Sequence, residues 1–180
     1  SWMRILKSVE GSILWLFEDN APAATNLRRE AEQRGIGGER LIFAPRMELG
    51  EHLARHRLAD LFLDTLPYNA HTTASDALWA GLPVLTRVGK AFAGRVAASL
   101  LTAIDLPELI TETAEEYEAL AIELARDSQK LKQIRQKLNA NRLTKPLFDT
   151  PRFTRHIEAA YEAMNKRHQA GLPPDHIEIW

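Results

Sequence analysis

An imidazole and two hydroxyl groups stand together at His71, Thr72 and Thr73, and a carboxylate follows at Asp76. They follow the apolar run 60–65 across a short loop and stand at the start of a helix predicted over 72–80. The first amides of a helix have no intrahelical partners, and the partial positive charge there favours an anion. The group therefore suits a diphosphate, with Asp76 one turn beyond Thr72 and placed to accept hydrogen bonds from a ribose.

A purely structural interpretation competes with this one. Thr73 and Asp76 have the spacing of a capping box, in which a threonine and an acid three residues later satisfy free helix amides. That interpretation gives no role to His71 or Thr72. These residues alone leave both alternatives open.

A second pair of interest is His52 and Arg55, one turn apart in a helix predicted over 50–59. An imidazole can stack on a nucleobase, and a guanidinium can donate to the carbonyl oxygens of the base. The alternative is an exposed polar helix face with no ligand. His52 and His56 have no third metal ligand near them in sequence, so we expect no metal site.

The sequence lacks the short motifs of several enzyme classes. The first predicted strand is followed by EDNAPAATN instead of a glycine-rich dinucleotide fingerprint, and no GxxxxGK(S/T) or GxSxG occurs. This argues against an NAD-dependent dehydrogenase, a P-loop enzyme and a serine hydrolase.

Apolar runs alternate with helical periodicity over the first 127 residues. The runs predict strands over 12–18, 40–45, 60–65, 83–86 and 108–110, and the periodic segments predict a helix at the very start and others over 20–35, 50–59, 72–80, 91–103 and 113–127. Strands that are apolar throughout and separated by single helices indicate an α/β, Rossmann-like doubly wound parallel sheet. Ligands collect at the carboxyl ends of such strands, and the loop 65–72 lies there.

Helical patterns alone continue from residue 128 onwards. An apolar stripe at helical spacing is formed by Phe153, Ile157, Tyr161 and Met164. Such a stripe needs a surface to pack on, either the sheet of this lobe or another lobe. We expect one lobe over 1–168 with these extra helices, and an irregular tail over 169–180. Helical spacing from the first residues, without a preceding cap, suggests a chain cut from a longer protein.

Composition indicates an ordinary globular domain. Of the 180 residues, 45% are hydrophobic and 26% charged, the net charge is −1, and cysteine is absent. This balance gives no general attraction to nucleic acid or an anionic membrane. No apolar run approaches the roughly 20 residues of a membrane-spanning helix, and the start lacks a signal-peptide core, so we expect a cytoplasmic location.

Several segments in chain order carry a family pattern, namely ILWL (13–16), NL followed by A and G (26–35), EHL (51–53), LADLFLDTLPYNAHTTASDALWAGLPVLT (58–86), RVAASLL (95–101), EYEALAIELARD (116–127) and PLFDTPRF (146–153). They resemble the carboxyl-terminal catalytic lobe of the O-linked N-acetylglucosamine transferases and their SPINDLY relatives. The resemblance implies the donor-binding lobe of a GT-B glycosyltransferase that moves N-acetylglucosamine from UDP-GlcNAc to serine or threonine of an acceptor protein, with no metal or other cofactor.

The resemblance also implies roles for individual residues. His71, Thr72 and Thr73 match the residues that hold the diphosphate in the family. The resemblance implies that Thr72 and Thr73 of this chain stabilise the leaving group. Asp76 matches the carboxylate that lies beside the ribose. His52 and Arg55, on one predicted helix, match the residues that contact uracil in the family. The backbone near Met47 matches a further contact to the base.

Some family features are missing or different. Leu49 stands where relatives place a lysine near the ribose. The phosphate-holding glutamine and lysine, the catalytic base, the amino-terminal lobe and the tetratricopeptide repeats match no part of this sequence, so no residue here is expected to act as acid or base. The alternatives are a non-catalytic nucleotide-binding or scaffold module, and a related transferase that uses UDP-glucose or GDP-fucose.

Overall fold

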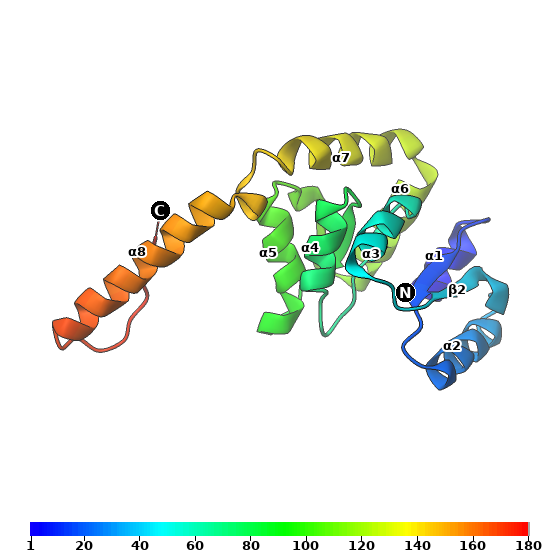
Figure 1. The fold of residues 1–180 in the computed structure, drawn as a ribbon. Helices are drawn as coiled ribbons and strands as arrows, with labels where there is room; N and C mark the ends of the chain where they lie inside the picture. The colour runs from blue at the N-terminus through cyan, green and yellow to red at the C-terminus, as the bar shows by residue number, and fades with distance from the viewer. Residues whose placement is uncertain (180) are drawn as a thin grey trace.

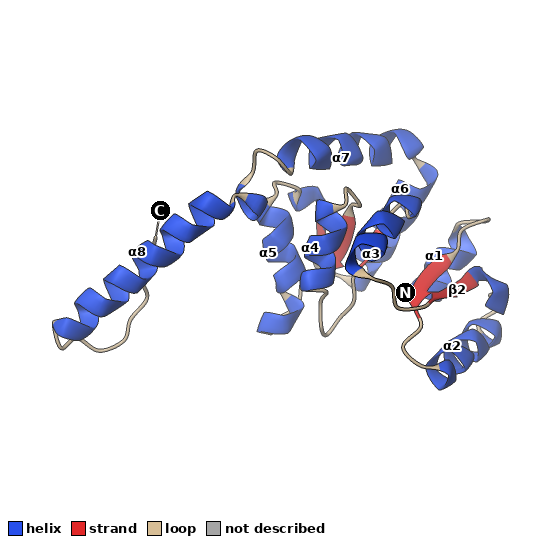
Figure 2. Ribbon diagram, viewed as in Figure 1, coloured by secondary structure: helices blue, strands red, loops and turns tan. Residues whose placement is uncertain are grey.

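The computed structural model describes residues 1–179, which form short strands flanked by helices, as shown in Figures 1 and 2. The strands are β1 (Leu14–Phe17), β2 (Leu41–Ala44), β3 (Phe62–Leu63), β4 (Val84–Arg87) and β5 (Ile110–Thr111). The α-helices are α1 (Trp2–Ser8), α2 (Ala21–Gln33), α3 (Leu49–Arg55), α4 (Thr72–Trp79), α5 (Val96–Ala103), α6 (Ala114–Arg126), α7 (Ser128–Asn141) and α8 (Thr150–Gln169). Short 3-10 turns are η1 (Gly38–Arg40), η2 (His56–Leu58), η3 (Phe92–Gly94), η4 (Pro107–Leu109) and η5 (Pro146–Phe148).

Every pair of hydrogen-bonded strands is parallel, which confirms the Rossmann-like α/β class. The strands form two groups, β1-β2 and β3-β4-β5. Apolar packing connects the groups, because Leu63 of β3 lies against the core of the β1-β2 unit and Ile5 of α1 packs in one cluster with Leu85 of β4. The carboxyl ends of β3 and β4 are therefore neighbours at one edge.

The main core surrounds β4 and the helices beside it. Val84 and Leu85 are fully buried, and α4 contributes Ala74, Ala77 and Leu78, each with no exposed surface. Two of these three helix residues are alanines, whose small side chains let α4 lie close to its neighbours. The helix that begins at the predicted ligand loop is thus fixed along its inner face.

The predicted boundaries differ from the structure in several places, and the strand predicted over 60–65 is only Phe62–Leu63. The expected helix over 91–103 is broken, with η3 followed by α5, and the helix over 50–59 divides into α3 and η2. The expected strand over 108–110 is mostly the 3-10 turn η4, and β5 begins only at Ile110. Pro107 at the start of η4 favours a helical turn because its ring fixes φ.

The two carboxyl-terminal helices, α7 and α8, differ in how far they are buried. Helix α7 packs Ile134 and Leu138 into the main core, whereas α8 buries no residue and extends away from the lobe in Figure 1. The predicted stripe on α8 therefore does not pack on this lobe's own sheet, and Phe153 and Tyr161 are 65% and 63% exposed. Residues 172–179 form neither helix nor strand.

Candidate functional site

The loop that leaves β3 is anchored by the buried carboxylate of Asp64, which is only 5% exposed. One carboxylate oxygen accepts a hydrogen bond from the Ala70 amide at 2.6 Å, and the other accepts from Thr86 Oγ1 at 2.6 Å. The backbone oxygen of Asp64 accepts from the Tyr117 hydroxyl at 2.8 Å. Burial raises the pKa of the Asp64 carboxyl, and the bonds from Thr86 and Ala70 oppose that rise. One side chain thus joins both ends of the loop to β4.

Asn69 fixes the middle of the same loop. Its side chain donates to the Thr65 carbonyl oxygen at 2.8 Å, and its amide donates to the Ala93 carbonyl oxygen at 2.8 Å. The second bond connects the β3–α4 loop to the β4–α5 loop. The backbones meet closely here, since a Cβ built on Gly94 would lie 3.2 Å from the Pro67 carbonyl oxygen. The loop between β3 and α4 (the ligand loop, residues 64–71) is therefore held in place by the loop between β4 and α5.

Helix α4 begins at Thr72, with His71 as its N-cap and no side-chain capping hydrogen bond. The capping-box interpretation of Thr73 and Asp76 is therefore wrong, because Thr73 is already the second residue of the helix. The structure has a capping box elsewhere, where Thr113 and Glu116 exchange hydrogen bonds at the start of α6. The hydroxyls of Thr72 and Thr73 lie on exposed residues beside the first amides of α4.

His71 has an unusual environment at the start of α4. Its ring stacks on Tyr68 with the centroids 4.7 Å apart, and its edge-to-face contact with Phe92 is 6.2 Å long. Within residues 1–179, its Nε2 atom is buried without a hydrogen-bond partner. Such an unpaired polar atom costs about 1–3 kcal/mol, and a ligand that bonds to it would remove that cost.

A cavity of about 460 Å³ opens at this point. Its lining includes the end of β3, the anchored loop and the first residues of α4. His71, Thr72 and Thr73 all line it, together with Tyr68 and Asn69. Amides, hydroxyls and an imidazole therefore converge on one space of a size suited to a small ligand.

The second predicted pair lies on α3. Arg55 donates to the Pro45 carbonyl oxygen at 3.0 Å, and its other terminal nitrogen is 2.7 Å from His52 Nδ1. Partial burial lowers the pKa of His52, and the nearby His56 and Arg55 lower it further. His52 is therefore a neutral imidazole near pH 7, with Nδ1 accepting from Arg55 and Nε2 carrying the proton.

The structure brings the α3 and α4 groups into one region. The Asp76 carboxylate is near enough to His52 to oppose the fall in the imidazole pKa. Met47, which is 41% exposed, lies in the loop between β2 and α3 that Arg55 holds through Pro45. Leu49 at the start of α3 is 65% exposed and offers no charge. The predicted site residues thus line two neighbouring helix segments.

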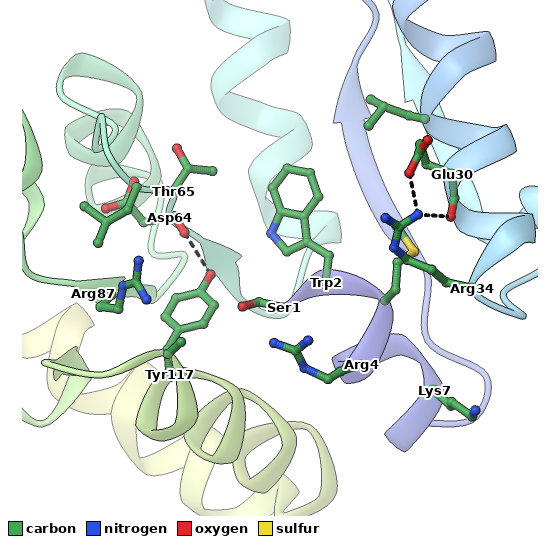
Figure 3. Close-up of a pocket in the computed structure, with 14 residues that line it drawn as sticks. Ser1, Trp2, Arg4, Lys7, Glu30, Arg34, Asp64, Thr65, Arg87 and Tyr117 are labelled. Carbon is green, nitrogen blue, oxygen red and sulfur yellow. Dashed lines mark hydrogen bonds and ion pairs between the residues drawn. The ribbon is translucent and has the colours of Figure 1, made fainter.

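A larger cavity of about 760 Å³ lies at the same edge of the fold. Figure 3 shows Trp2 between Arg87 with Tyr117 on one side and Glu30 with Arg34 on the other. Asp64 contributes to both cavities. Arg4 at its rim is paired with Glu118, with Nε and Oε2 2.7 Å apart. Size alone does not identify a site, and the smaller cavity is the one that collects the unpaired polar groups of α4.

Sequence reasoning missed the residues that support the loop. Asp64 and Asn69 are buried polar residues, and Asp64 directly follows an apolar strand, which is the signal that points to a role at the carboxyl edge. It also missed Tyr68 and Phe92 beside His71. No spacing rule links Phe92 to the loop, because that contact depends on the pairing of β3 with β4.

The parallel strands, the covering helices and a polar cavity at the carboxyl ends define a Rossmann-like ligand-binding lobe. A family model for glycosyl transferase family 41 matches residues 1–157, and the chain belongs to this family.

Relatives extend the comparison over nearly the whole chain. It is 39% identical over 180 residues to a probable UDP-N-acetylglucosamine–peptide N-acetylglucosaminyltransferase SEC of Arabidopsis thaliana, covering 99% of this chain and 18% of that protein. A Caenorhabditis elegans UDP-N-acetylglucosamine–peptide N-acetylglucosaminyltransferase is 37% identical over 176 residues, and the match covers 98% of this chain and 15% of that protein. The chain spans less than a fifth of either relative.

A solved structure is similar as well. A K341M mutant of the Thermobaculum terrenum O-GlcNAc transferase superposes with a TM-score of 0.85 and 37% identity, covering 91% of this chain and 32% of that one. The fold of this chain is thus that of a lobe within a GT-B glycosyltransferase. In residues 1–179, no helix has the length and apolar character needed to cross a membrane.

Proposed function

We propose that this chain is the donor-binding lobe of a protein O-glycosyltransferase that transfers N-acetylglucosamine from UDP-GlcNAc to serine or threonine. The observation that carries the proposal is the buried, unpaired Nε2 of His71 beside the free start of α4. Family membership and the names of the two relatives above support the choice of donor.

The donor would lie along the line from α3 to α4. The uracil contacts His52, Arg55 and the backbone near Met47, and the ribose hydroxyls donate to the Asp76 carboxylate. The diphosphate then reaches the start of α4, where Thr72 and Thr73 donate hydrogen bonds. Asp76 lies one turn into the helix and so stays clear of the phosphates, which its charge would repel.

The chemistry that this lobe supports is departure of UDP. The acceptor oxygen bonds to the anomeric carbon, the bond from that carbon to the diphosphate oxygen breaks, and its electron pair remains on UDP. Amides and hydroxyls already aimed at the diphosphate stabilise the growing charge, and losing one such donor costs on the order of 3 kcal/mol in the barrier. The hydroxyl proton goes to a base outside these 180 residues, and we expect no metal to take part.

A second lobe completes the proposal. The exposed stripe of α8 offers an apolar face for an amino-terminal lobe, where Phe153 and Tyr161 would become buried. That lobe would supply the base and orient the acceptor protein. We therefore expect the 180-residue chain to bind UDP weakly and to transfer no detectable sugar, and we propose a cytoplasmic location for the enzyme.

Calorimetric titration of the chain with UDP and with GDP tests the proposal. We expect UDP to bind more tightly, and Thr72→Ala to weaken UDP binding by at least about ten-fold, because a hydrogen bond to a charged group is lost. Thr150→Ala is a matched control, since Thr150 is the exposed first residue of α8. Equal binding of UDP and GDP, or no effect of Thr72→Ala, would instead favour a non-catalytic module.

A further inference from the structure

His56 is a buried histidine at the end of α3 for which the proposed donor site has no role. It is 8% exposed and lies where α3 ends and the turn η2 begins. Its Nδ1 atom is 2.7 Å from the carbonyl oxygen of His52. Because a carbonyl oxygen only accepts hydrogen bonds, Nδ1 of His56 carries a proton and donates this bond. The last four carbonyl groups of a helix have no intrahelical partner, so His56 satisfies one of them in α3.

The ring of His56 also supports the ring of His52. The two imidazoles meet edge to face, with their centroids 4.7 Å apart and an interplanar angle of 87°. A second contact comes from Arg55, whose terminal nitrogen is 2.7 Å from His52 Nδ1. Arg55 is itself held by the Pro45 carbonyl oxygen at 3.0 Å. The His52 imidazole is thus restrained by His56 at its ring and by Arg55 at Nδ1.

The restrained pair of His52 and Arg55 presents hydrogen-bond donors and no acceptor. With Nδ1 of His52 occupied by Arg55, only the Nε2–H group is left to face a ligand. The guanidinium of Arg55 has donors alone, and those not used on Pro45 and His52 remain free for a ligand. Uracil carries a carbonyl oxygen, an acceptor, at the position where cytosine carries an amino group, a donor. A site made of donors therefore favours uracil over cytosine.

We infer that His56 is a positioning residue for base recognition, which holds the His52 ring so that its Nε2–H group is presented to a carbonyl oxygen of uracil. The inference rests on the proposed function, in which the uracil lies against α3. His56 touches no ligand and acts through His52. Without His56 the His52 ring is free to rotate and to change tautomer, and a bare ring nitrogen then accepts from the amino group of cytosine. His56 therefore sets the preference for UDP over CDP.

Two substitutions of His56 test this role, because asparagine and leucine have similar size and shape but only asparagine keeps a donor near the position of Nδ1. Calorimetry of the 180-residue chain measures the binding of UDP and of CDP. In the unchanged chain we expect UDP to bind more tightly by at least about ten-fold. His56→Leu should weaken UDP binding by roughly five-fold and change CDP binding by less than about two-fold, while His56→Asn keeps most of the preference. His168→Leu, at an exposed histidine in the last turn of α8, is the matched control.

Nitrogen NMR of the imidazole rings observes His52 directly, because protonated and unprotonated ring nitrogens have different chemical shifts. We expect the His52 proton on Nε2 in the unchanged chain and in His56→Asn, and a mixture of the two tautomers in His56→Leu. A purely structural role of His56 would lower the free energy of unfolding in urea and change neither the tautomer nor the ratio of UDP to CDP affinity. His56→Phe, which keeps a ring without the donor, supplies the same comparison if His56→Leu does not fold.

The outcomes separate this inference from the proposed function. If His56→Leu leaves the affinity ratio and the His52 tautomer unchanged, the positioning role is refuted while the nucleotide site stands. If His56→Asn loses the preference as fully as His56→Leu, the hydrogen bond to His52 is not its cause, and the inference is refuted as well. If UDP does not bind at all, or binds without regard to Thr72, the proposed function fails and the inference fails with it. Circular dichroism spectra of each variant establish that a loss of binding does not come from unfolding.

Discussion

Replacing Asp64 by alanine removes the acceptor that joins the ligand loop to β4. Two donors then lose their partner, namely the Thr86 hydroxyl, which is fully buried, and the Ala70 amide. A buried donor left unsatisfied costs about 1–3 kcal/mol. We therefore expect Asp64→Ala to lower the free energy of unfolding by about 3–4 kcal/mol, a large part of the roughly 5–15 kcal/mol that stabilises a typical domain.

Urea denaturation followed by circular dichroism measures this change, and a double-mutant cycle with Thr86→Val separates the specific pair from general damage. Thr86→Val removes the buried hydroxyl at nearly constant shape, so the double variant should be less destabilised than the sum of the single variants by at least about 1 kcal/mol. Additive effects, or a loss below about 1 kcal/mol for Asp64→Ala, would refute the anchoring role of this carboxylate.

Two further predictions concern the scaffold. Arg4 and Ser1 hold the folded-state pKa of Glu118 at about 2, below its ordinary value of 4.5, so this pairing stabilises the fold fully above pH 4.5 and is lost as the pH falls toward 2. Glu118→Gln should therefore destabilise the chain at pH 7 and have a progressively smaller effect as the pH falls from 4.5 toward 2. A destabilisation that is constant across this range would contradict the assignment. Leu78→Ala, at a fully buried position of α4, should cost about 2–5 kcal/mol by urea denaturation, with exposed Leu143→Ala as a control that changes little.

The sequence predicted the alternation of strands and helices because a fully buried parallel strand and an amphipathic helix have distinct periodicities. It also placed His71, Thr72 and Thr73 at the start of a helix. It did not decide between a cap and a ligand site, since both use threonine and an acid at the same spacing. The structure settled the capping question, because α4 begins two residues earlier than a cap at Thr73 requires.

The sequence could not predict which residues make contacts with distant parts of the chain. Asp64 bonds to Thr86 and Tyr117, which are 22 and 53 positions away in the chain. No local periodicity records such a pairing, which appears only when β3, β4 and α6 pack together. The aromatic contacts of His71 have the same origin, since Phe92 belongs to the loop after the next strand.

Helix α8 is a long helix that contacts the rest of the chain near its first residues and buries no residue of its own. Its 20 residues span about 30 Å at the usual helical rise, so a rotation of about 10° at its base moves its tip by roughly 5 Å. The base is braced by the Trp79–Phe148 contact, with ring centroids 5.1 Å apart, and by the 2.8 Å ion pair between Lys145 and Asp105. Trp79 is the last residue of α4, the helix whose first residue is Thr72. A small displacement of α4 would therefore be magnified at the far end of α8.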